Sequence, residues 1–424
     1  MSKSGENCCY QSPADEDGNR APCQFDATAK ILVEVGGYTF CLHHLPYSEN
    51  DLIEEYGSSN GENPNDYKES WDKERCKEFV ADVHEELRAA RKSDAPCNLT
   101  GTVFPAAFAS SRKLLPGTSF VDCHFARGAS FVDASFSDNV AKFTGAKFSG
   151  GPAVFFDLRT DGGSLYFEGA KFIDIDANFG TSGTPKNGTN ENTYIIRVAD
   201  FNGAEFSGEA KFINRKLRNR TSFEEVTFRK APRFHGCEFH QDTTFPPIDN
   251  FKDTEDKNAA HAYRTLRLAM KQQEAHEEEA MFWALEQRSK RNNLDLKRPS
   301  KWLPWALSWA YQWLSAYGLS ETRPLLWLGA WAAVIAPLIY FFLRNPIDQL
   351  AKPVGYSDIL GFSLAQSVRP FFIWGDYDGS DIKSVLGEHI DPLSVKLFAT
   401  ADSLISLVLI ALLILAVRRR FRMQ

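Results

Sequence analysis

Cysteine and histidine residues near the N-terminus have the side chains needed to bind a metal ion. Thiolates and imidazoles suit a closed tetrahedral zinc site, and such a site would stabilise a segment that has few apolar residues for a core. The candidate ligands are Cys8 or Cys9, Cys23, Cys41 and His44. Only Cys41 and His44 have a spacing typical of zinc ligands, and four unrelated reduced thiols are the alternative. We expect a small module over residues 1–47 with zinc as its structural cofactor.

Other patterns that perform chemistry are missing from the sequence. It has no nucleophile elbow, no phosphate-binding loop and no paired carboxylates at a strand end. His261, His276 and the neighbouring glutamates fall on one predicted amphipathic helix. We interpret this helix as a cap and linker and assign no catalytic role to these residues. The sequence therefore predicts that this protein is not an enzyme.

Length and charge favour several domains in a reducing compartment. A chain of 424 residues is too long for one ordinary core. The formal net charge is -7, with the acidic excess before Leu99 and a basic C-terminus at Arg418 to Arg422. The polar start of the chain, residues 1–7, does not resemble a signal peptide. The cysteines are therefore expected to be reduced, which favours a metal site over disulfides.

A short repeat between Phe120 and Phe245 organises the middle of the chain. Phenylalanine returns every five to seven residues with a small residue two positions ahead, as in Ala129-Ser130-Phe131. This period indicates a repeat architecture, and it does not match the spacing of apolar residues on one face of an α-helix. We expect the phenylalanine and the small residue to point inward in a coil that turns after each unit. The predicted inward residues include Phe131, Phe136, Phe148, Phe172, Phe206, Phe212, Phe228 and Phe239.

This pattern resembles the pentapeptide-repeat family, and the resemblance implies a right-handed quadrilateral β-helix, here expected over residues 99–248. Many steps are longer than five residues, and residues 180–198 interrupt the ladder, where 181–190 is interpreted as a loop. With about 22 residues per coil and roughly 4.8 Å between coils, the rod would be on the order of 28 Å long. A soluble relative mimics DNA through negative charge, but this repeat is nearly balanced, so no nucleic-acid partner is expected.

Helical segments are predicted on both sides of the repeat. Residues 48–98 combine an acidic linker with a helix over 66–92, whose apolar stripe would cover the exposed end of the β-helix. Residues 249–300 are predicted to form an amphipathic coupling helix over 257–291. In residues 301–323, tryptophans recur at helical steps after several basic residues, which is typical of a helix in the membrane interface. These tryptophans are Trp302, Trp305, Trp309 and Trp313.

Residues 324–424 are predicted to cross a membrane twice. The stretch 325–343 carries no charge, and 397–417 carries only Asp402, so each is long enough for about 30 Å of hydrocarbon. Basic residues precede the first span and follow the second, while the segment between them is net acidic. The positive-inside rule then places both termini in the cytoplasm. We expect a multi-pass protein of the inner (plasma) membrane with a cytosolic β-helix.

The segment between the spans, residues 354–375, resembles the pore helix of two-transmembrane pore-loop channels. The similarity lies in 358–363, and the Thr-Val-Gly-Tyr-Gly filter of potassium channels is absent. An extracytoplasmic amphipathic helix without a pore is the alternative. The pore-lining candidates are Asp402, Ser406, Leu409, Leu413, Arg369, Ser363 and Gln366. Asp402 would otherwise pair with Lys396 or Arg369 and only fix its helix in place.

This order of modules predicts a homo-oligomeric membrane ion channel or pore, with the β-helix as a regulatory or partner-binding domain. Several copies must assemble, because two spans from one chain cannot enclose an aqueous path. The alternative is a membrane-anchored scaffold or binding protein without conduction. The expected partners are the lipid bilayer, further copies of the chain and a cytosolic protein ligand of the β-helix.

Overall fold

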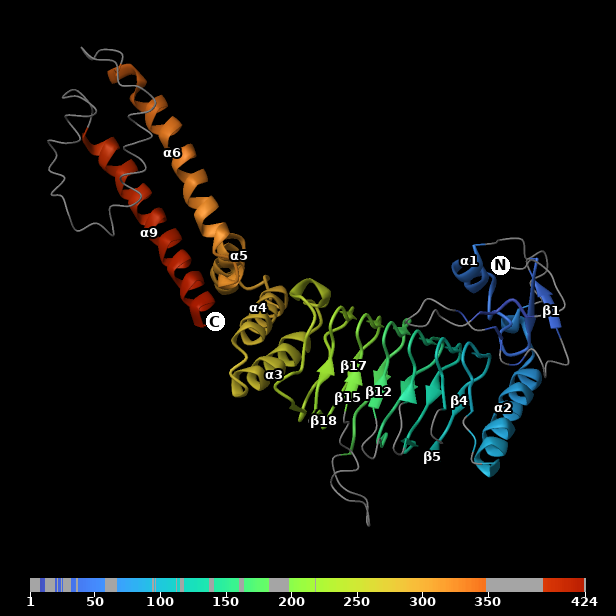
Figure 1. The fold of residues 1–424 in the computed structure, drawn as a ribbon. Helices are drawn as coiled ribbons and strands as arrows, with labels where there is room; N and C mark the ends of the chain where they lie inside the picture. The colour runs from blue at the N-terminus through green and yellow to red at the C-terminus, as the bar shows by residue number, and fades with distance from the viewer. Residues whose placement is uncertain are drawn as a thin grey trace. The chain divides into compact units, whose positions relative to one another are not determined.

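The computed structural model describes residues 8–11, 20, 22–23, 25, 32–35, 37–57, 67–93, 95, 97–111, 113–114, 118–136, 141–159, 164–182, 198–217, 219–347 and 392–422. These residues belong to two compact units, Met1–Asn293 and Leu294–Gln424 (Figure 1).

A four-sided parallel β-solenoid forms the centre of the first unit (Figure 1). The first side is a six-stranded sheet of β3 Val103–Phe104, β6 His124–Phe125, β10 Lys147–Phe148, β13 Lys171–Phe172, β16 Glu205–Phe206 and β20 Thr227–Phe228. The second side is a five-stranded sheet of β4 Phe108–Ala109, β7 Ala129–Ser130, β11 Ala153–Val154, β14 Ala177–Asn178 and β17 Ala210–Lys211.

The other two sides have fewer strands. Four strands make the next sheet: β9 Ala141–Lys142, β12 Ser164–Tyr166, β15 Val198–Asp200 and β19 Thr221–Ser222. The last side has two pairs, β5 Lys113–Leu114 with β8 Ser135–Phe136 and β18 Lys216–Leu217 with β21 Glu238–Phe239. The chain passes through the four sides in a fixed cyclic order, so strands on the same side come from successive turns and pair in parallel.

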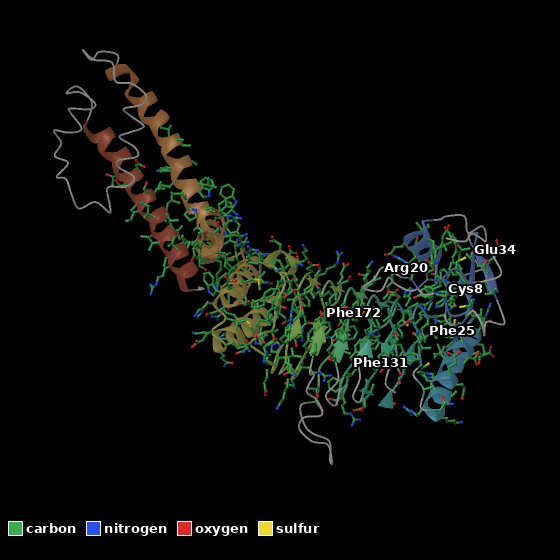
Figure 2. All side chains as sticks on the ribbon, viewed as in Figure 1. Cys8, Arg20, Phe25, Glu34, Phe131 and Phe172 are labelled. Carbon is green, nitrogen blue, oxygen red and sulfur yellow. The ribbon has the colours of Figure 1, made fainter. Side chains whose placement is uncertain are left out.

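Columns of stacked phenylalanine rings fill the solenoid, and Figure 2 labels Phe131 and Phe172 among them. The ring of Phe172 lies 4.8 Å from that of Phe148 and 4.6 Å from that of Phe206, nearly parallel to both. The alanine two positions before each ring is also buried, as at Ala170 and Ala204. The spacing of the rings is close to the distance between neighbouring strands, because paired strands hold equivalent residues one above the other.

The predicted inward phenylalanines are buried with few exceptions. The fully buried ones are Phe131, Phe148, Phe172, Phe206, Phe212 and Phe228. Phe239 is half-buried on the last turn. Phe136 lies in β8, and the placement of its side chain is outside the described residues. The interrupting segment 183–197 is also outside them.

Arg215 is fully buried where the strands of the fourth side are divided into two pairs. Its guanidinium donates to the carbonyl oxygens of Leu158 at 2.8 Å and Phe155 at 3.1 Å, and its Nε donates to that of Phe179. These carbonyls belong to two earlier turns of the solenoid. The side chain therefore supplies hydrogen bonds to the backbone where the strand ladder of this side is interrupted.

Replacing Arg215 is expected to destabilise the solenoid strongly. Arg215→Met keeps the apolar bulk but leaves the Leu158 and Phe179 carbonyls without these donors, and each costs about 1–3 kcal/mol. The Phe155 carbonyl still accepts from the Leu158 backbone N–H at 3.3 Å. We expect a loss of roughly 3 kcal/mol or more in denaturant unfolding followed by circular dichroism. Arg233→Met is the control, because Arg233 is more exposed and its ion pair with Glu209 should contribute no more than about 1 kcal/mol. Equal midpoints for the two variants would contradict this role of Arg215.

Helices and a hairpin cover the N-terminal end of the solenoid. The hairpin pairs β1 Leu32–Val35 with β2 Tyr38–Cys41 through Gly37, whose φ of 79° suits glycine. Helix α1 Glu49–Tyr56 begins with a capping box between Ser48 and Asp51, and it lies in the stretch that was predicted to be a linker.

Helix α2 Lys73–Ser93 follows the short 3₁₀ helix η2 Lys68–Ser70 and begins later than predicted. An Asp72 carboxylate accepts from the Arg75 backbone N–H at 2.8 Å, which marks the start of α2 and leaves Trp71 outside it. On the covering face, the ring of His84 stacks 5.0 Å from Phe108 in the first turn of the solenoid.

The opposite end of the solenoid is covered by two helices. The single helix predicted over 257–291 is interrupted at Glu274, which has a φ of 59°, giving α3 Ala259–Gln272 and α4 His276–Asn292. Phe282 of α4 packs edge-on 5.2 Å from Phe245 and 5.5 Å from Phe251, which follows the 3₁₀ helix η4 Ile248–Asn250. The last phenylalanine rings are thereby shielded from water.

The second unit is helical. It contains η5 Pro299–Lys301, α5 Trp302–Ser315, η6 Ala316–Gly318, α6 Thr322–Ile347 and α9 Pro392–Arg422. The tryptophans of α5 are exposed, with 62% of the Trp302 surface accessible. Among the described residues, one helical stretch, Thr400–Arg418 in α9, has the length and apolar composition to cross a membrane. The loop 354–375 with Ser363, Gln366 and Arg369 lies outside the described residues.

Candidate metal centre

Three separate segments bring Cys8, Cys23, Cys41 and His44 together in the first unit. Cys8 and Cys23 come from two short segments that are joined by a bridge between Gln11 and Pro22. Cys41 ends strand β2, and the backbone N–H of His44 donates to the Cys41 carbonyl at 3.1 Å in the turn that follows. This turn brings the Cys41 thiol and the His44 ring to the same side.

The four side chains present a compact set of ligand atoms. All four ligand atoms lie within 4.8 Å of one another, and all four residues are buried. The Nδ1 atom of His44 is 3.5 Å from the Cys8 sulfur, 3.2 Å from that of Cys23 and 3.4 Å from that of Cys41. The sulfurs of Cys23 and Cys41 are 3.7 Å apart.

These distances fit the edges of a small tetrahedron. With metal–sulfur bonds of about 2.3 Å and metal–nitrogen bonds of about 2.0–2.1 Å, ligand atoms in a tetrahedral site lie roughly 3.5–3.8 Å apart. None of the eight cysteines, all of which are described, forms a disulfide. The four residues can therefore hold a metal ion once the widest separation, which is within 4.8 Å, closes by roughly 1 Å.

The orientation of the His44 ring is fixed by its other nitrogen. Nε2 lies 3.0 Å from the backbone carbonyl of Thr100, which can only accept, so Nε2 carries the proton. Nδ1 then directs its lone pair at the three sulfurs. Tyr10 stacks on the imidazole with ring centroids 3.8 Å apart. A hydrogen bond from the distal nitrogen to a carbonyl is the usual support of a metal-binding histidine.

Electrostatics favour a shared negative charge in the cluster. Hydrogen bonds from Cys23 and Cys8 lower the pKa of Cys41 to about 3. The same contact with Cys41, together with Cys8 and burial, raises the pKa of Cys23. The backbone N–H of Cys41 also donates to the Cys8 sulfur at 3.3 Å. A divalent cation would stabilise further thiolates in place of the protons that they share.

The structure decides between the two alternatives at the first ligand position. Cys8 belongs to the cluster, whereas the sulfur of Cys9 accepts from the backbone N–H of Thr39 at 3.4 Å. Adjacent residues of an extended segment point to opposite sides, so only one of the two thiols can reach the cluster. Cys9 is therefore removed from the predicted ligand set.

Lys68 is a supporting residue that no sequence pattern indicates. Its ammonium is fully buried and donates to the backbone carbonyls of His43 at 3.1 Å and Val103 at 2.6 Å. It also lies 4.1 Å from the ring centroid of Phe79. Burial lowers the pKa of Lys68 well below its usual value. These contacts join the turn that carries Cys41 and His44 to strand β3 of the solenoid.

In the second unit, Asp402 and Ser406 are buried on the side of α9 that packs against α6. The indole N–H of Trp331 donates to the Asp402 carboxylate at 3.0 Å, and the Ser406 hydroxyl lies 3.4 Å from the same oxygen. Leu409 is also buried, and Leu413 is half-buried. The side chain of Lys396 and all of Arg369 are outside the described residues. Trp331 was not predicted as the partner of Asp402.

Comparisons with protein-family models, with curated proteins and with solved structures give no match to this chain.

Proposed function

We propose that this chain is a membrane-anchored binding protein, in which a zinc-stabilised β-helix of the pentapeptide-repeat type serves as a rigid cytosolic platform. The observation that carries the proposal is a solenoid covered at both ends in the first unit, in a chain whose second unit contains an apolar helix long enough to cross a bilayer. A rod with covered ends presents its sides to a protein ligand, because the interior is filled with phenylalanine.

Zinc is the metal that suits the cluster best. Three thiolates and one imidazole are soft and borderline ligands, which tetrahedral Zn²⁺ accepts and which Mg²⁺ or Ca²⁺ does not prefer. Four protein ligands leave no open coordination position for a water molecule or substrate. The role of the ion is therefore structural, and it would hold together the segments around Cys8, Cys23 and Cys41.

Features of the helical unit support two spans and an interfacial helix. Besides α9, helix α6 contains the uncharged stretch 325–343, long enough for the hydrocarbon core. Helix α5 exposes tryptophan and leucine side chains and follows Lys297, Arg298 and Lys301. Aromatic side chains beside basic ones suit the headgroup region of an anionic membrane surface.

The outward side chains of α9 favour an anchor over a pore. They are apolar and suit lipid or another copy of the chain: Leu404, Ile405, Leu407, Val408, Ile414 and Leu415. Asp402 accepts from Trp331 of α6 in the same chain, and the Ser406 hydroxyl donates to the same carboxylate. A conducting homo-oligomer is the second candidate, since a carboxylate inside an apolar span often serves ion passage.

Two-span topology predicts a defined labelling pattern. Cysteines introduced at Gly355 and Gly379 are expected to react with an impermeant maleimide in intact cells, whereas one at the exposed Asn202 of the solenoid should react only after permeabilisation. The variant at Asn202 is thus the internal control, and the unsubstituted chain gives the background from the native cysteines. Labelling at Asn202 in intact cells would contradict the cytosolic placement of the solenoid.

Current recording from the purified protein in planar bilayers separates the two candidates. The anchor predicts no reproducible unitary currents from correctly inserted protein. If unitary currents appear, and Asp402→Asn shifts their reversal potential in asymmetric salt, the conducting oligomer replaces the anchor as the proposed function.

A further inference from the structure

A pocket of about 340 Å³ lies between the metal-binding module, helix α1 and the first turns of the solenoid. Its walls include Tyr10 and Arg20 of the N-terminal segments, Tyr56 of α1, and Asp122 and Lys147 of the solenoid. Figure 2 shows Arg20 in the N-terminal part of this unit. The volume is in the range of pockets that bind small molecules.

Most charged groups in this pocket already have partners. The Lys147 ammonium contacts the carboxylates of Glu54 at 3.2 Å and Glu55 at 3.1 Å. The Asp51 carboxylate accepts from the Ser48 backbone N–H at 3.1 Å and from its hydroxyl at 2.7 Å. Nε2 of His124 lies 3.1 Å from the Ser149 hydroxyl. These groups are structural and leave little capacity for a ligand.

Two polar groups in the pocket wall differ from the others. The Tyr10 side chain is 9% exposed, and its hydroxyl has no hydrogen-bond partner among the described residues. No hydrogen bond or ion pair within the described part of the chain engages the Asp122 carboxylate either. Burial raises the pKa of Asp122 to about 6, with Glu55 adding to the increase and Lys147 and Arg20 opposing it. Arg20 and Lys147 act on the Asp122 carboxylate only from beyond ion-pair distance, so this carboxylate and the Tyr10 hydroxyl can both take a ligand as a direct partner.

Glycines in two solenoid turns leave the space that these side chains occupy. A Cβ atom at Gly145 would lie 2.1 Å from Oδ1 of Asp122, and one at Gly101 would lie 2.3 Å from Cζ of Tyr10. Both glycines have positive φ values, 69° and 74°. Asp122 and Tyr10 can lie over the turns only because no side chain is present there.

The remaining wall is aromatic. The rings of Tyr10, Tyr47 and Tyr56 line the pocket together with Asp122. A carboxylate beside several phenol rings is the combination that recognises organic cations, through ion pairing and cation–π attraction. A phenol oxygen can also accept a hydrogen bond from an N–H group.

We propose that this pocket binds a small organic cation, an amine or guanidinium compound, with its charged group between Asp122 and the hydroxyl of Tyr10. This site is independent of the proposed membrane function. Because α1 and the metal-binding module both contribute to its walls, an occupied pocket would hold them against the solenoid.

The test is isothermal titration calorimetry of the purified, metal-loaded full chain with agmatine and with putrescine. Saturable binding of one molecule per chain is expected for at least one of them. Asp122→Asn should weaken this binding at least tenfold, and Tyr10→Phe, which keeps the ring on His44, should weaken it severalfold. Asp174→Asn should leave it unchanged, because Asp174 has the same φ of 53° as Asp122 but is exposed on another turn.

The unsubstituted protein gives a second readout that does not depend on how a variant folds. Asp122 is ionised above its pKa and neutral below it, so affinity should be retained at pH 7.5 and fall at pH 5. His124 also faces the pocket, and any charge that it gains in acid would act in the same direction, so loss of the pH dependence in Asp122→Asn identifies the carboxylate. Absence of saturable binding by both amines, undiminished binding by Asp122→Asn, or binding of succinate instead would overturn the proposal.

Discussion

Replacing Cys41 with serine is expected to abolish binding of the proposed zinc ion and unfold the N-terminal module. Three thiolates and His44 would hold the ion in a closed site, and removal of one ligand would open it. Structural zinc sites contribute on the order of 10 kcal/mol to folding of their modules. Metal analysis of the purified chain should find about one zinc per wild-type molecule and almost none in Cys41→Ser. Amide exchange in β1 and β2 should then become fast.

Cys9→Ser is the matched control for this prediction. It changes the same kind of residue next to a ligand, yet Cys9 lies outside the cluster. The variant should keep its zinc and its slow amide exchange. A wild-type chain whose module is folded without metal would contradict the proposed metal site. Equal loss of zinc from Cys41→Ser and Cys9→Ser would contradict the choice of Cys8 over Cys9 as a ligand.

Phe172→Ala is expected to cost about 3–5 kcal/mol of solenoid stability, as for other fully buried aromatic residues. The ring is stacked between those of Phe148 and Phe206, so its removal leaves a cavity in the middle of a column. Close packing of the neighbouring turns prevents the gap from closing. Denaturant unfolding followed by circular dichroism measures the loss.

Neighbouring substitutions show whether the inward side is assigned correctly. Ile173→Ala changes an exposed residue of the same turn and should cost less than about 1 kcal/mol. Phe239→Ala should fall between the two, because its ring is half-buried on the last turn. Ala204→Leu should be harmful by about 1–3 kcal/mol, since it overpacks the interior. If Ile173 rather than Phe172 pointed inward, Ile173→Ala would cost more stability than Phe172→Ala.

The sequence by itself determined the solenoid and the segments that carry the candidate metal ligands. A phenylalanine that returns with a small residue two positions ahead sets which side of each short strand is buried, and this depends on local spacing alone. Cys41 and His44 are likewise brought together by one turn of the chain. Local spacing also predicted helices on both sides of the repeat, although the break at Glu274 was missed because no proline or glycine marks it.

Only the tertiary structure decided which distant groups meet. Cys8 and Cys9 are equivalent in sequence, and the fold selects Cys8 because its sulfur lies beside Cys41 and His44, whereas the Cys9 sulfur lies against the backbone of Thr39. Lys68 and Arg215 look like surface residues, yet each is buried because it hydrogen-bonds carbonyls from remote turns. The pocket around Asp122 likewise needs three elements that approach one another only after folding. Contacts between residues far apart in the chain depend on the packing of whole elements, which no local pattern contains.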